Sequence, residues 1–97
     1  MTWMEIEWDD ASLDHIARHG LDRDDVEEAL FDPRRILTDA RSTGADRRRG
    51  VTGRTEEGRI ITVIFARRVG ATRIVTARDA NPTERRAYTR PARREGG

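Results

Sequence analysis

The 97-residue sequence contains no cysteine, no lysine and only five aromatic side chains. Without cysteine the chain cannot form a disulfide, a thiolate metal site or a cysteine nucleophile, so its stability has to come from packing. A glycine-rich phosphate loop and a nucleophile-elbow serine are also missing, which argues against nucleotide-binding and serine-hydrolase classes.

The chain also lacks an apolar run of 18 residues, and its first twenty residues carry five acidic side chains. From these two features we expect no contact with a membrane, no signal peptide and a cytoplasmic location. The length suits one domain. We expect residues 1–90 to form it and residues 91–97 to be a flexible tail.

Charged residues make up 38% of the chain and are distributed unevenly. Residues 1–40 contain 12 acidic and 4 basic side chains, a net charge of −8, whereas residues 41–97 contain 6 acidic and 15 basic ones, a net charge of +9. All 19 cations are arginine, whose planar guanidinium can bind a phosphate through two hydrogen bonds. This polarity favours a nucleic acid or an acidic protein as the partner, unless folding brings the two halves together.

Helix-start signals occur three times along the sequence. Asp9 and Asp22 are predicted N-caps of two amphipathic helices in the acidic half, and Gly20 suits the left-handed residue that ends the first of them. Pro33 is expected to stop the second helix. A third, short helix is predicted to begin after Asn81 through a capping box.

Elsewhere the hydrophobic period is close to two, which predicts strands. The expected strands are an edge strand at 4–8, a short strand at 35–38, and an antiparallel meander of 47–54, 60–66 and 72–78, with a polar loop at 41–46. The composition of 60–66 is that of a central strand covered on both faces. In the last strand, alternation would put Arg78 on the same face as Ile74 and would put Val75 on the other.

These elements predict an α+β fold in which two N-terminal helices pack on a small antiparallel sheet with a short C-terminal helix. The expected core includes Leu13, Ile16, Val26, Leu30, Ile61, Val63, Phe65 and Val75.

His15 and His19 lie four residues apart on one predicted helix and could bind a metal from the same face. The chain offers no third histidine and no cysteine, so we expect no metal ion and no cofactor. In the last turn of its helix, His19 could titrate near neutral pH or contact a phosphate. It could equally be a surface histidine that caps helix carbonyls.

Arg78 and Tyr88 each allow two interpretations. Arg78 ends a strand of otherwise apolar or small residues, where it could form a structural ion pair with Asp79 or Glu84, or point a fixed guanidinium at a phosphate. Tyr88 could stack on a base, or could simply pack the last helix against the rest of the protein.

Short motifs follow one another along the chain: Trp8-Asp9, Arg18-His19-Gly20, Phe31-Asp32-Pro33, Gly53-Arg54, Ile74-Val75-Thr76-Ala77-Arg78, Ala80, and Glu84-Arg85-Arg86-Ala87-Tyr88. In this order they resemble the BrnT family of type II toxins, over residues 3–90. The resemblance implies a RelE/ParE-like fold, an endoribonuclease that blocks translation, and neutralisation by a cognate BrnA-type antitoxin, with a toxin–antitoxin heterotetramer as one assembly. The family's basic-His-Gly and Ala-Arg motifs map onto Arg18, His19 and Arg78.

RNA cleavage without a metal requires cations that stabilise the pentavalent phosphorus, together with a general base and a general acid. Arg78, Arg54 and Arg18 are the candidate cations. Arginine does not release its proton, so His19 is the first choice for proton transfer, ahead of Glu56, Glu57, Glu84 and Tyr88. The expected RNA contacts are Arg49, Arg67, Arg68, Arg85 and Tyr88.

Two other functions fit the same residues. The basic sheet could belong to a non-catalytic module that binds nucleic acid or protein, or the fold could carry a ParE-like gyrase inhibitor, because a fold does not determine its target.

Overall fold

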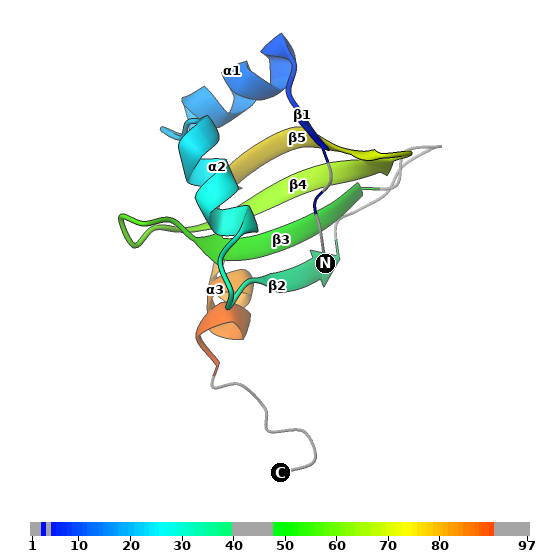
Figure 1. Cartoon of the computed structure of the whole chain (residues 1–97). Coiled ribbons are helices and arrows are strands. Elements are labelled where there is room, and N and C mark those ends of the chain that lie inside the picture. Colours follow the sequence, from blue (N-terminus) through cyan, green and yellow to red (C-terminus); the bar gives the residue numbers. More distant parts are fainter. Residues whose placement is uncertain (1–2, 4, 40–47, 91–97) are drawn as a thin grey trace.

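The computed structural model describes residues 3, 5–39 and 48–90 (Figure 1). The predicted polar loop at 41–46 and tail at 91–97 lie outside these residues. Within them the chain forms β1 (Glu5–Glu7), α1 (Asp10–Arg18), α2 (Arg23–Leu30), β2 (Ile36–Asp39), β3 (Arg48–Arg54), β4 (Ile60–Arg68), β5 (Ala71–Asp79) and α3 (Pro82–Thr89). None of the described helices is long and apolar enough to cross a bilayer.

All three helices begin at the predicted capping residues. Asp9, Asp22 and Asn81 each accept a hydrogen bond from the N–H three residues later, and the side chain of that later residue accepts one from the N–H of the cap. After α1 the chain turns at Gly20, whose φ of +71° is strained for other residues. Local sequence therefore determines where these helices start.

The strand order is β1-β5-β4-β3-β2, with β4 in the centre and β1 and β2 at the edges. The antiparallel meander β3-β4-β5 and the edge position of β1 are confirmed. The expectation of a purely antiparallel sheet is wrong, because β1, the predicted edge strand ahead of the helices, pairs in parallel with β5. The buried Trp3 sets this direction: its carbonyl accepts a 2.7 Å hydrogen bond from Thr72, and its ring packs edge-on against Phe65.

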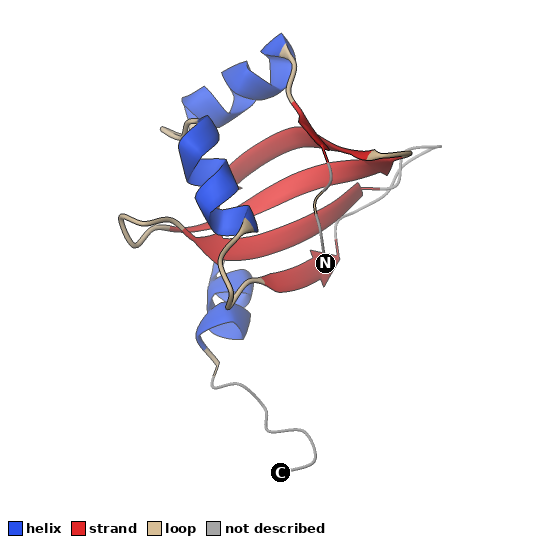
Figure 2. Cartoon of the chain, viewed as in Figure 1, coloured by secondary structure: helices blue, strands red, loops and turns tan. Residues whose placement is uncertain are grey.

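α1 and α2 lie on one face of the sheet, which we call the covered face (Figure 2). Ile61, Val63 and Phe65 point to this face and are fully buried in the core. The alternate residues Thr62 and Ile64 point to the opposite face, here the open face, where α3 covers only one end.

The predicted core is largely confirmed: Ile16, Val26, Leu30, Ile61, Val63 and Phe65 are buried. Leu13 is half-buried against the core, and Val75 is half-buried as well. The expectation that 60–66 is covered on both faces is wrong, because Ile60, Ile64 and Ala66 are only half-buried on the open face.

A β-bulge in β5 overturns the predicted alternation of that strand. Phe65 lies opposite Ile74 and Ile64 lies opposite Thr76, so Val75 has no partner in the register. The extra residue shifts the phase, and both Ile74 and Ala77 point into the core. Arg78 therefore lies on the face opposite to Ile74.

Candidate functional site

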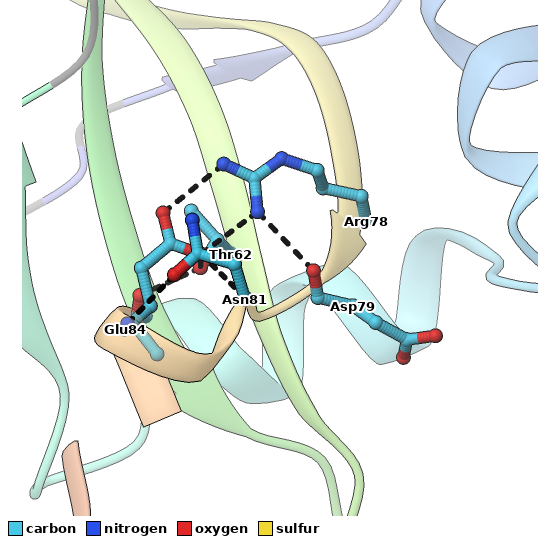
Figure 3. Close-up of polar contacts among 6 residues, drawn as sticks. Thr62, Arg78, Asp79, Asn81 and Glu84 are labelled. Atoms are coloured by element: carbon cyan, nitrogen blue, oxygen red, sulfur yellow. Dashed lines mark hydrogen bonds and ion pairs between the residues drawn. The ribbon is translucent and has the colours of Figure 1, made fainter. Parts of the chain in front are cut away.

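Arg78 is held by a two-pronged ion pair with Glu84 on the open face (Figure 3). Its Nη1 donates to Glu84 Oε1 at 2.7 Å and its Nη2 donates to Oε2 at 3.0 Å, while Nη1 also donates to the carbonyl of Asp79 at 3.2 Å. Glu84 Oε1 also accepts from the N–H of Asn81 at 2.9 Å. One carboxylate thus closes the capping box of α3 and clamps Arg78. Of the two predicted acidic partners of Arg78, the structure selects Glu84.

Two buried threonines extend this contact into the sheet. Thr62 donates to Glu84 Oε1 at 2.9 Å, and its hydroxyl lies 2.7 Å from that of Thr52 on β3. Because the proton of Thr62 points to Glu84, Thr52 must be the donor between the two hydroxyls. The carboxylate is therefore supported from below by the sheet, as well as from the side by Arg78.

The environment of Glu84 keeps it ionised. Partial burial opposes ionisation, but hydrogen bonds from Arg78, the N–H of Asn81 and Thr62 outweigh this effect and lower the pKa of Glu84 to about 2. A carboxylate with this pKa is a poor general base at neutral pH. The Arg78 side chain is 35% exposed and that of Glu84 only 14%, so a ligand would reach the guanidinium first.

His19 lies at the C-terminal end of α1, where Arg59 ties this end to β5. The Arg59 guanidinium donates to the carbonyls of His19 and Gly20 at 2.5 and 2.8 Å, and its Nε pairs with Asp79 at 2.9 Å. This hydrogen bond lowers the pKa of Asp79, with a smaller contribution from the charge of His19. No group of three or more His, Asp or Glu side chains that could hold a metal occurs in the described part of the chain.

His19 and Arg78 lie at the same end of the sheet but on different faces. Asp79, beside His19, is opposite Ile61 and points to the covered face, whereas Arg78 is opposite Thr62 and points to the open face. Arg18 is exposed in the last turn of α1, next to His19.

Arg54 and Tyr88 meet around Asp32, one helical turn of α3 away from Glu84. Asp32 Oδ2 accepts from the Tyr88 hydroxyl at 2.5 Å and from the N–H of Arg54 at 2.8 Å. Burial and the hydrogen bond to Asp32 raise the pKa of Tyr88 to about 12. Tyr88 is therefore neutral at physiological pH and anchors α3 to the segment that follows α2.

The other predicted RNA contacts are spread over the surface. Arg67 and Arg68 lie opposite Thr72 and Ala71, at the end of β4 farthest from Thr62. Arg49 is exposed near the start of β3, and Arg85 is exposed on α3 next to Glu84. The predicted site residues thus form separate groups rather than one cluster.

Sequence reasoning missed three supporting residues. Thr62 is a polar residue inside the apolar run of β4, and this interruption was a usable signal. Asp32 stands within one of the family motifs. Arg59 has no local signal, because the two carbonyls just after α1 that it binds lie 39 and 40 residues away.

The family model for BrnT, the ribonuclease toxin of type II toxin-antitoxin systems, matches residues 8–84. The chain belongs to the BrnT family. Its BrnT family membership implies ribonuclease activity at the family level and an antitoxin protein as partner. The match includes His19, Arg54, Arg78 and Glu84, and it ends before Tyr88. No curated protein matches the chain.

Proposed function

We propose that this BrnT-family toxin cleaves RNA without a metal ion and thereby blocks translation, and that Arg78 supplies the fixed positive charge at the reacting phosphate. The observation that carries the proposal is the clamp on Arg78. Of its five N–H donors, three are used within the described residues, by Glu84 and the carbonyl of Asp79. Nε and the second hydrogen on Nη2 remain, and together they form an edge that can bind two phosphate oxygens.

A preorganised cation of this kind stabilises charge that develops in the transition state. When the ribose 2′-hydroxyl attacks the adjacent phosphate, the pentavalent phosphorus carries two negative charges. A guanidinium already held by Glu84 needs no reorientation at that moment. Glu84 acts here as a positioning residue, because its low pKa makes it a poor base.

Proton transfer is assigned to His19, with Arg18 beside it as a second cation. Support comes from the position of His19 at the end of the sheet where Arg78 also lies, so that an RNA strand lying across this end would contact both. Arg54 would hold a more distant phosphate. We further propose that the partner is a BrnA-type antitoxin, that the pair assembles as a heterotetramer, and that the topology is RelE/ParE-like.

The test is cleavage of a short RNA by the purified toxin in excess chelator, from about pH 5 to about pH 9. We expect Arg78→Ala to lose about 2–4 kcal/mol of transition-state stabilisation, and His19→Ala to lose about 100-fold in rate. Matched controls are Arg73→Ala, on the same strand as Arg78, which removes the ion pair between Arg73 and Asp9, and His15→Ala on α1. Both should cleave at nearly the wild-type rate.

Circular dichroism on each variant separates chemistry from folding. Unfolding of Arg78→Ala would mean that its guanidinium is structural, and Arg78→Lys would then show whether charge alone restores activity. Cleavage abolished by the chelator would contradict the metal-independent mechanism. Full toxicity of both Arg78→Ala and His19→Ala, when expressed in growing cells, would favour the non-catalytic binding module.

A further inference from the structure

A cleft of about 730 Å³ opens between the C-terminal half of α3, the segment leading into β2, and the paired ends of β3 and β4. Tyr88 and four arginines line it, over a floor that includes the half-buried Ile36 and Ile60. The lining residues are Arg34, Arg35, Arg54 and Arg90. No acidic side chain is among the described residues that form its wall.

Three arginines of the cleft differ from the arginines that form ion pairs in the described part of the fold. Arg59, Arg73 and Arg78 each form an ion pair with a carboxylate. Within the part of the chain that the structure describes, the guanidinium groups of three cleft arginines form no such pair: those of Arg34, Arg54 and Arg90.

Arg35, the fourth cleft arginine, is already engaged. Its Nη1 donates to the carbonyl of Asp32 at 3.1 Å, and its guanidinium lies over the ring of Trp3. The remaining three cations converge on one cavity without a carboxylate in its wall, which is the electrostatic arrangement that an anionic ligand requires.

A neighbouring hollow of about 600 Å³ provides a contrast in charge. It shares only Pro33 and Arg54 with the cleft. It is otherwise lined by Phe31, Thr55 and five acidic side chains, namely Asp24, Glu27, Glu28, Asp32 and Glu56. An anion is thus directed to one side of Arg54 and repelled from the other.

Tyr88 adds a flat surface to the charged cleft. Its hydroxyl is tied to Asp32 at 2.5 Å, so its ring is held in place before any ligand arrives. Preorganised aromatic rings bind unpaired bases by stacking, at little cost in conformational entropy. Three free guanidinium groups around one anchored ring match the chemistry of a nucleotide with its flanking phosphates.

We propose that this cleft binds a nucleotide of single-stranded RNA, with the base against Tyr88 and the flanking phosphates on Arg34, Arg54 and Arg90. The inference rests on the proposed function, since it takes RNA as the substrate. Glu84 and Tyr88 are four residues apart on one face of α3. An RNA strand with its reacting phosphate at Arg78 would therefore place a neighbouring nucleotide in the cleft.

The experiment measures binding apart from cleavage. A fluorescent single-stranded 2′-O-methyl RNA cannot be cleaved by 2′-hydroxyl attack, so its anisotropy with the full-length toxin reports binding alone. We expect Arg34→Ala and Arg54→Ala each to weaken binding and to reduce the slope of log affinity against log salt by about 0.7. Arg86→Ala, on α3 but outside the cleft, is the matched control and should bind as the wild type does.

Tyr88→Ala should weaken binding by about 5- to 150-fold through loss of stacking, whereas Tyr88→Phe, which keeps the ring, should stay within a few-fold of wild type. If circular dichroism shows that Tyr88→Ala disturbs α3, the proposal is tested by Arg34→Ala and Arg54→Ala alone. Wild-type affinity and salt slope in both Arg34→Ala and Arg54→Ala would overturn the proposal. Displacement of the RNA by polyglutamate at lower concentration than by unlabelled RNA would also overturn it, in favour of an acidic protein ligand.

The same variants separate this proposal from the function on which it rests. Normal RNA cleavage by the wild type, together with unaltered binding in the arginine variants, would contradict the proposed RNA-binding cleft and support the ribonuclease activity. Loss of binding in those variants, with a wild type that cleaves no RNA, would support the RNA-binding cleft and contradict the proposed ribonuclease activity.

Discussion

The two faces of the sheet are closed in different ways. On the covered face, α1 and α2 bury apolar side chains such as Ile16, Val26 and Leu30 completely. On the open face, α3 buries none of its own residues and is held by polar contacts, chiefly those of Glu84 and Tyr88. Apolar packing on one face gives stability, whereas polar anchoring on the other leaves a guanidinium and a cleft within reach of a ligand. The proposed phosphate contact of Arg78 and the cleft therefore lie around α3, whereas His19 lies at the end of α1.

Two glycines of β3 provide the strongest test of this difference. A Cβ on Gly53 would lie 2.3 Å from the backbone oxygen of Ala29 on α2, whereas a Cβ on Gly50 would lie 2.4 Å from the Thr38 hydroxyl on the open face. A packed helix backbone cannot move aside, but a side chain can rotate. We expect Gly53→Ala to lower the free energy of unfolding by about 3 kcal/mol and Gly50→Ala by about 1 kcal/mol, as measured by urea denaturation. Equal losses would contradict the comparison.

Substitution of Glu84 should lower the free energy of unfolding by an intermediate amount that depends on pH. Its pKa is lowered from 4.5 to about 2 in the folded protein, so its stabilisation is complete above about pH 4.5 and is lost as the pH falls toward about 2. We expect Glu84→Gln to cost about 1–2 kcal/mol at neutral pH, and this difference from wild type to shrink over that window. Urea denaturation at several pH values measures it, with the exposed Glu57→Gln as control. A pH-independent difference would show that the carboxylate charge is unimportant.

The smallest effect on stability is expected from ionisation of Tyr88. This ionisation can be observed directly, because Tyr88 is the only tyrosine in the chain. Its pKa is raised to about 12, so its contribution to stability is present below about pH 10 and is lost as the pH rises toward 12. The ultraviolet absorbance of the phenolate should rise with a midpoint near pH 12. Asp32→Asn should move this midpoint down toward 10, and an unchanged midpoint would contradict the assigned hydrogen bond.

Features that depend on neighbouring residues were predictable from the sequence. The caps at Asp9, Asp22 and Asn81 act over three residues, and the meander follows from consecutive apolar runs. The bulge at Val75 was not predictable, since Thr72–Arg78 alternates without an interruption in the sequence. The parallel pairing of β1 also escaped prediction, because the partner strand is specified by the burial of Trp3 far from β5 in the chain.

The same distinction between contacts of neighbouring residues and contacts of distant residues applies to the candidate site. Glu84 could be named as a partner of Arg78 because it lies six residues away, just inside the predicted helix. The bridge from Arg59 to α1 and the contact between Tyr88 and Asp32 span 39 to 56 residues, and only the tertiary fold brings these groups together. The cleft beside Tyr88 is a product of such long-range contacts, so its arginines did not stand out from the other cations.

The pairing of β1 with β5 also has a consequence for synthesis of the protein. Glu5 lies opposite Ala71, so β1 has no partner in the sheet until β5 has been made. A nascent chain that ends before β5 has neither a completed sheet nor Arg78 and α3. The sheet therefore closes only once β5 has been made, and the proposed site on Arg78 and α3 can form only after that step.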